Sequence, residues 1–157
     1  MHFKNILVPY DESDHALSAL HTALALAGPY PEARVHVITV IPAGALPGPT
    51  LMGEGIGTAY ALSNPASYEE LMDSVVGRVR AEVDEAVRRS LDDARCQVVT
   101  DAIISASPVE GIAEYVERQG IDLVVMGRRG LGALRGMLGS VSFGVLRSVE
   151  VPVLTVK

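Results

Sequence analysis

The segment from Gly127 to Ser142 carries the residue types that bind an anion. It contains five glycines, at positions 127, 130, 132, 136 and 139, and three arginines, at positions 128, 129 and 135. Glycine lets a ligand approach the backbone closely, and Gly139-Ser140 begins a predicted helix whose free N–H groups and dipole attract negative charge. The hydroxyls of Ser140 and Ser142 would add donors. The segment therefore fits a phosphate site, although turn glycines, a helix cap and solvated arginines would look the same.

The spacing of these glycines differs from two common phosphate-binding motifs. The segment lacks the Gly-Lys-Ser/Thr of a P-loop. Gly127, Gly130 and Gly132 also differ in spacing from the dinucleotide fingerprint, which would follow the first strand. Any phosphate site here belongs to another class.

Charge is unevenly distributed along the chain. The 157 residues carry a formal net charge of −6, which argues against a general binder of nucleic acid or anionic membrane. Residues 121–157 hold five basic and two acidic side chains, a net charge of +3 that leaves −9 for residues 1–120. A basic C-terminal quarter on an acidic protein is consistent with a local anion site.

Asp11, Glu12 and Asp14 form an acidic cluster after the first predicted strand. They could be a solvated loop, a helix cap or a platform for a metal ion. Together with Asp101 they also fit, loosely, a phosphoacceptor receiver domain, but such a domain has no use for the glycine-rich segment.

The sequence offers no catalytic set and no defined metal site. Four histidines, at positions 2, 15, 21 and 36, lack metal-site spacing. No serine-histidine-aspartate arrangement or nucleophile elbow is present, so no catalytic residue is assigned and the metal ligands stay unknown. A Mg²⁺ ion could accompany a bound triphosphate, because Mg²⁺ usually takes ligands from phosphates and water.

Apolar patterning predicts alternating strands and helices. Strands are expected at residues 3–10, 34–41, 96–104, 121–126 and 151–157, and helices between Ser13 and Gly28 and at 68–92, 107–119 and 140–149. Ser13 and Ser107 are the expected N-caps of their helices, and Gly120 is expected to end the helix at 107–119. This order predicts an α/β fold, a single doubly wound five-stranded parallel sheet with helices on both faces. Ligands of such sheets bind where the strand order reverses, which points to the ends of the first and fourth strands.

The inward helix faces and the organisation of the chain follow from the same pattern. Leu71 is placed on the inward row of the second helix and Leu146 on that of the last.

One domain is expected over residues 1–157, with a long loop at about 42–67 that is rich in proline and glycine. Cys96 is the one cysteine, so a disulfide framework is excluded. No signal-type or membrane-spanning run is visible, and a cytoplasmic protein is expected.

The sequence resembles the universal stress protein family and, within that family, the ATP-binding subgroup. The resemblance rests on the first strand with Asp11, on Gly127-x-x-Gly130 followed by Gly139-Ser140, and on the final strand, and it covers nearly the whole chain. The family's nucleotide-binding members carry nine residues before the Gly-Ser or Gly-Thr pair. This chain has eight residues between Gly130 and Gly139, which is one fewer.

The resemblance implies a site for ATP or another adenine nucleotide. Pro9 and Tyr10 would lie beside the adenosine, and Asp11 would accept hydrogen bonds from ribose hydroxyls. Val40 and Met126 would line the adenine pocket.

It also implies which residues meet the phosphates. The ribose-phosphate path would follow Gly127, Arg129 and Gly130. The phosphates would be held by the start of the last helix, at Gly139, Ser140, Val141 and Ser142.

The implied role is that of a regulatory or sensor module in a stress response, which forms a homodimer through the last strand, residues 151–156. That strand is apolar and is expected at an edge of the sheet, and a bare apolar edge invites pairing. Slow ATP hydrolysis is one alternative, and a protein-interaction dimer that does not bind nucleotide is another.

Overall fold

A computed structural model describes residues 2–28, 30–45, 65–91, 95–129 and 138–157. The elements follow in the order β1 (Asn5–Pro9), α1 (Asp14–Ala27), β2 (Arg34–Pro42), the short 3₁₀ helix η1 (Ala43–Ala45), α3 (Pro65–Ser90), β3 (Gln97–Ser105), α4 (Pro108–Gln119), β4 (Leu123–Gly127), α5 (Ser140–Ser148) and β5 (Val153–Val156).

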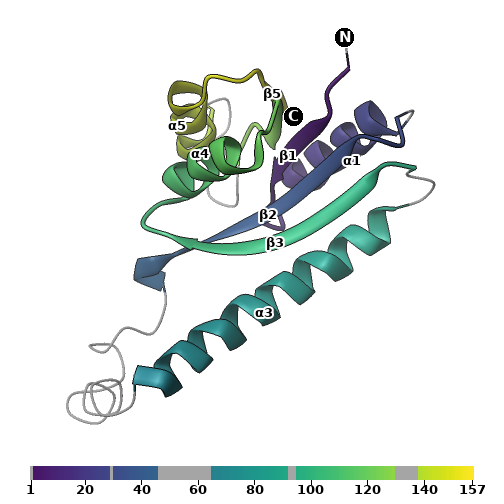
Figure 1. The fold of residues 1–157 in the computed structure, drawn as a ribbon. Coiled ribbons are helices and arrows are strands. Elements are labelled where there is room, and N and C mark those ends of the chain that lie inside the picture. Colours follow the sequence, from purple (N-terminus) through teal and green to yellow (C-terminus); the bar gives the residue numbers. More distant parts are fainter. Residues whose placement is uncertain (1, 29, 46–64, 92–94, 130–137) are drawn as a thin grey trace.

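The five strands form one parallel sheet in the order β3-β2-β1-β4-β5 (Figure 1). β1 lies at the centre, and the strand order reverses between β1 and β4. The predicted fold class is confirmed, and the reversal point lies at the two strand ends that the sequence indicated.

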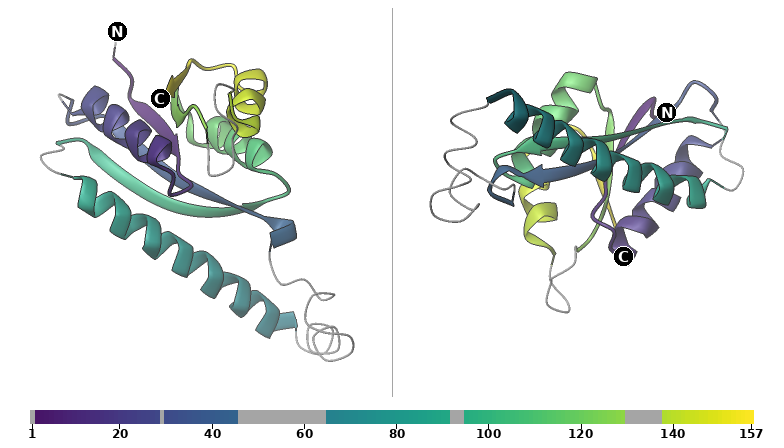
Figure 2. Two further views of the ribbon diagram at one scale, coloured as in Figure 1. Left: turned by 180° about the vertical axis from the view of Figure 1, so that it is seen from behind. Right: turned by 90° about the horizontal axis from the view of Figure 1, so that it is seen from below.

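Helices cover both faces of the sheet, and each face has its own core (Figures 1 and 2). One core is built with α1 and α3 and contains Ile6, Val8 and Val125. The other is built with α4 and α5 and contains Leu7, Val124 and Met126. Alternate residues of the central strands thus point to opposite faces, as the two-residue period of a strand requires.

Local capping residues set the helix ends. Ser13 accepts a hydrogen bond from the backbone N–H of Ala16 at the start of α1, and Ser107 accepts one from Glu110 at the start of α4. Gly120 ends α4 with a φ of 60°, the left-handed conformation that glycine adopts without strain. Both N-caps and the glycine stop are therefore as predicted.

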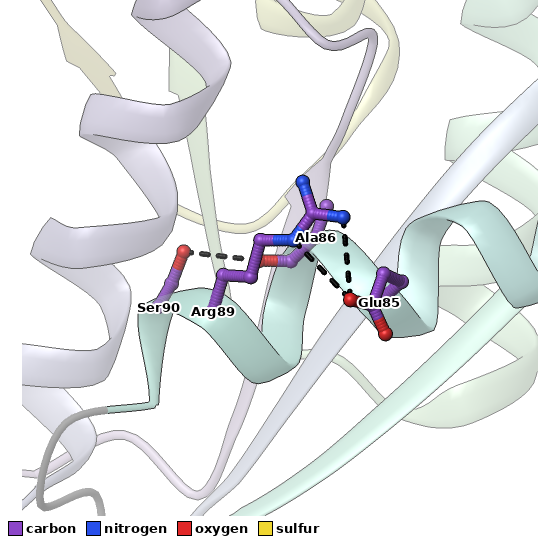
Figure 3. A network of polar contacts seen from close by, with 4 residues as sticks. All are labelled: Glu85, Ala86, Arg89 and Ser90. Carbon is purple, nitrogen blue, oxygen red and sulfur yellow. Dashed lines mark hydrogen bonds and ion pairs between the residues drawn. The ribbon is translucent and has the colours of Figure 1, made fainter.

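The helix α3 is longer than the sheet that it covers. Its 26 residues span about 39 Å, whereas the nine residues of β3 span about 30 Å. Val83 and Val87 are buried against the sheet, while Leu71 is 37% exposed. At the C-terminal end, Arg89 pairs with Glu85 and the Ser90 hydroxyl donates to the Ala86 carbonyl (Figure 3).

The predicted loop and the orientation of two predicted inward leucines were wrong. Of the expected loop at 42–67, Pro42 belongs to β2, residues 43–45 form η1 and residues 65–67 belong to α3, while residues 46–64 lie outside the described residues. Leu71 does not face the core: it lies in the first half of α3, which diverges from the sheet (Figure 1). Leu146 is 43% exposed, because α5 turns Ser142 and Val145 inward instead.

A search of the helices, confined to the described ranges, found none with the length and apolar character needed to span a bilayer.

Candidate functional site

The carboxyl ends of β1 and β4 meet at the start of α1. The two strands pair directly, with Ile6 opposite Leu123. Gly127, the last residue of β4, lies so close to α1 that an added Cβ would stand 2.8 Å from the backbone of His15. This close approach places the turn that follows β1 beside the end of β4.

That turn holds the Asp11 carboxylate in a fixed position. Its Oδ1 accepts from the Ser13 hydroxyl at 2.6 Å and from the Ser13 backbone N–H at 3.2 Å. Glu12 between them has a φ of 63°, in the left-handed region that residues other than glycine rarely adopt. Asp11 is exposed while Ser13 is buried, so the carboxylate faces solvent from a buried support.

Hydrogen bonds tie the start of α5 to the end of β4. The backbone N–H of Gly139 donates to the Arg128 carbonyl at 2.9 Å, and the Ser142 hydroxyl donates to the Gly127 carbonyl at 2.9 Å. The Arg128 N–H donates in turn to the Val156 carbonyl at 2.7 Å. Both ends of the glycine-rich segment are therefore held at the carboxyl edge of the sheet.

The first turn of α5 is suited to an anion. Gly139 occupies the N-cap position with extended backbone and caps the helix with no side-chain hydrogen bond. Ser140 follows and is exposed. The first N–H groups of a helix have no partner within the helix, and the helix dipole adds positive potential there. The N-terminus of α5 thus offers donors at the place the sequence indicated.

The two predicted phosphate-binding hydroxyls differ in their surroundings. Ser142 is 3% exposed, and its hydroxyl proton is used by the Gly127 carbonyl. The Ser140 side chain, by contrast, is exposed. A ligand can therefore reach the Ser140 hydroxyl, whereas the Ser142 hydroxyl holds the start of α5 against the end of β4.

The predicted adenosine-side residues separate between the two faces of the sheet. Val40 and Met126 belong to the core under α4 and α5, where Val40 packs beneath Gly111. Tyr10 is buried in the core on the opposite face, so only its backbone can take part on the Val40 side. Burial raises the pKa of the Tyr10 phenol, and the nearby carboxylates of Glu12 and Asp11 raise it further.

The remaining predicted residues occupy the same edge, except one that is not described. Pro9 ends β1, and Arg129 and Val141 are half-buried near the two ends of the glycine-rich segment. Gly130 lies outside the described residues.

Sequence reasoning missed two supporting side chains. Ser13 was expected to cap α1, but its hydrogen bond to Asp11 was not; the signal was the Asp-x-Ser spacing, which favours a side-chain turn of this kind. Thr39 donates through its hydroxyl to the Tyr10 carbonyl at 2.8 Å and joins the end of β2 to the end of β1. A threonine in a strand gives no such signal.

Across the described ranges, no group of three histidine, cysteine or acidic side chains is arranged to hold a metal ion.

These features define a doubly wound parallel α/β protein with its candidate site where the strand order reverses. The sequence model of the universal stress protein family (Usp) matches residues 2–157. The chain belongs to the universal stress protein family.

Named relatives match over nearly the whole chain. A universal stress protein of Thermus aquaticus, encoded in the 3′ region of the QAH/OAS sulfhydrylase, is 32% identical over 160 residues, or 99% of both chains. Universal stress protein MJ0531 of Methanocaldococcus jannaschii is 30% identical, over 99% of this chain and 82% of its own.

Solved structures share the fold. The structure of the M. jannaschii protein MJ0577 matches with a TM-score of 0.75 and 25% identity, over 100% of this chain and 97% of the other. A universal stress protein solved in complex with cAMP matches with a TM-score of 0.62 and 22% identity, over 99% and 98%. The Archaeoglobus fulgidus protein solved with dAMP matches with 0.59 and 19%, over 100% of both chains.

Proposed function

We propose that this protein binds an adenine nucleotide, ATP first among them, and works as a regulatory or sensor module in a stress response. One observation carries the proposal: the start of α5, where Gly139 offers no side chain to the first N–H groups, is tied to the end of β4, beside a turn that presents the Asp11 carboxylate. Hydrogen-bond donors for a phosphate and a carboxylate that accepts from hydroxyls thus lie at one edge of the sheet, at the reversal point where such folds bind ligands.

We assign a different part of the nucleotide to each group of site residues. The Ser140 hydroxyl and the first N–H groups of α5, including that of Val141, would meet the phosphates. Gly127, Arg129 and Gly130 would follow the ribose-phosphate path, and Asp11 would accept from the ribose hydroxyls.

The adenine would lie on the face of the sheet that α4 and α5 cover. Val40 and Met126 belong to the core on that face, and Pro9 ends the strand between theirs. The backbone of Tyr10, rather than its ring, would complete this side.

Structures of the same fold support the choice of ligand. Two of the matched proteins were solved with cAMP and with dAMP, both of which are adenine nucleotides. A Mg²⁺ ion would arrive with the triphosphate, because phosphate oxygens and water are its usual ligands.

Isothermal titration calorimetry of the purified protein with ATP tests the proposal. We expect saturable heat with ATP and weaker binding of GTP, since the adenine pocket is apolar. Absence of heat at about 1 mM ATP would contradict nucleotide binding and favour a protein-interaction dimer of the same fold. Phosphate release in the same samples, abolished by Asp11→Ala, would show hydrolysis in addition to binding.

We also propose that the protein pairs with a second copy through β5, which is an edge of the sheet.

A further inference from the structure

We infer that Ser13 is a positioning residue for nucleotide binding: its hydroxyl fixes the Asp11 carboxylate so that the second oxygen faces the ribose. The inference rests on the proposed function and adds to it a residue outside the ligand contacts. The start of α1 thereby contributes to nucleotide recognition.

The observation is a continuous chain of hydrogen bonds that ends on the carboxylate. The Ala16 backbone N–H donates to the Ser13 hydroxyl oxygen at 3.1 Å, and that hydroxyl donates to Oδ1 of Asp11 at 2.6 Å. Ser13 is 7% exposed. Because the N–H of Ala16 occupies an acceptor position on the Ser13 oxygen, the hydroxyl proton is directed toward Asp11.

This chain divides the two carboxylate oxygens between two tasks. Both hydrogen bonds from Ser13 fall on Oδ1, which leaves Oδ2 of the exposed Asp11 to accept from a ligand. A carboxylate is a strong acceptor, and one already held in its binding orientation loses less conformational freedom when the ligand arrives. A ribose, which carries neutral O–H donors, fits this acceptor better than a phosphate.

Ser13 also caps α1, so the experiment must separate positioning from helix stability. Asp122→Ala is the matched control. Asp122 accepts the backbone N–H groups of Lys4 and Asn5 at the amino ends of β1 and β4, opposite the candidate site. Its loss should lower stability and leave nucleotide affinity unchanged.

The test is a double-mutant cycle of Ser13→Ala and Asp11→Ala, read by calorimetry with ATP. Without Ser13 the Asp11 side chain must be ordered when the ligand binds, and the entropy cost of ordering one side chain corresponds to an affinity loss of up to about tenfold. We expect Ser13→Ala to weaken ATP binding by that factor in the wild-type chain and to have no further effect once Asp11 is alanine. Ser13→Thr should restore affinity. With 2′,3′-dideoxy-ATP, which lacks the ribose hydroxyls, wild type and Ser13→Ala should bind equally.

The possible outcomes separate failure of nucleotide binding from failure of the positioning role of Ser13. If the wild-type chain binds no ATP, the proposed function itself fails. If ATP binds and Ser13→Ala binds as tightly as wild type, or loses the same affinity in the Asp11→Ala background, positioning is overturned and nucleotide binding stands. Should Ser13→Ala not fold, Ser13→Gly replaces it, because glycine destabilises an N-cap much less than alanine does.

Discussion

At the scale of the residue, Gly127 lies where the first turn of α1 meets the end of β4. A Cβ at this position would stand 2.8 Å from the carbonyl carbon of His15 and 3.0 Å from the backbone nitrogen of Ala16. Backbone atoms of a capped helix cannot move aside as a flexible side chain can. Glycine is required here for the packing of α1, whatever its part in ligand binding.

We therefore predict that Gly127→Ala lowers the free energy of unfolding by about 1–3 kcal/mol, the usual cost of overpacking. Urea denaturation followed by circular dichroism measures the change. Gly77→Ala in α3 is the control, because nothing lies within 4 Å of an added Cβ there. It should stabilise the protein by about 0.5–1 kcal/mol through helix propensity. Equal effects of the two substitutions would refute the packing argument.

Ser142 shows where reasoning from single residues stops. Its type and position near a helix start predicted a phosphate-binding hydroxyl, yet the side chain points inward and donates to the Gly127 carbonyl. Serine fits either role, and the rotation of a nine-residue helix is decided by its packing against its neighbours. One such contact is the close approach of Gly144 in α5 to Val109 in α4. No sequence pattern indicates that these two residues meet.

At the scale of the element, signals that act within a few residues predicted most helix ends. The Ser107 cap and the Gly120 stop are examples. Strand ends depend on partners that are distant in sequence. The strand predicted from Ile121 begins at Leu123, because the Ile121 N–H bonds to the Val116 carbonyl of α4. An apolar run alone does not show whether its first residue belongs to the strand or to the end of the preceding helix.

A buried histidine, His36, lies where α4 contacts β2, and folding lowers its pKa. His36 is 5% exposed, its Nδ1 lies 3.1 Å from the Tyr115 hydroxyl, and its Nε2 is buried without a partner in the described part of the chain. Burial lowers the pKa of His36, and the neighbouring Arg34 guanidinium lowers it further. Arg118 stacks over the Tyr115 ring, and Asp101 of β3 is the acidic group on this side.

The lowered pKa makes stability depend on pH with a definite sign. Below about pH 6.5 the unfolded chain takes up a proton on this histidine while the folded chain still excludes it. The free energy of unfolding should therefore fall as the pH falls from about 6.5, by at most about 1.4 kcal/mol per pH unit for this one proton, and level off below the folded-state pKa. Urea titrations between about pH 7 and pH 5 measure this slope.

The double variant His36→Leu/Tyr115→Phe is the control for this slope. It removes the titrating ring together with the hydroxyl that would otherwise lose its partner. Its stability should vary less with pH over the same range. A slope equal to that of the wild type would assign the effect to other groups.

At the scale of the whole molecule, the alternation of strands and helices predicted the parallel sheet, and the sheet predicted the edge at which to look for the site. These steps hold because burial on both faces requires apolar strands, and right-handed crossovers limit the strand order. The hydrogen bonds that join Asp11 to Ser13 and Gly139 to Arg128 could not be predicted, because they depend on distances set by the folded backbone.

The two edges of the sheet differ in chemistry. β3 includes Asp101, and charges on an edge strand discourage pairing with another chain. β5, residues Val153–Val156, carries no charge, and its Leu154 is 39% exposed. Pairing of β5 with a second copy would satisfy the open backbone groups of this edge and cover that leucine.

Leu154→Lys should therefore yield monomers where the wild-type chain sediments as a dimer, because a lysine in the seam would bury its charge against the partner strand. Val99→Lys is the matched control: Val99 is 37% exposed and lies on β3, at the other edge of the same sheet. It should leave the dimer intact. Sedimentation velocity at several concentrations measures both variants. A dimer that persists in Leu154→Lys and dissociates in Val99→Lys would move the seam to β3, and a monomeric wild type would refute pairing altogether.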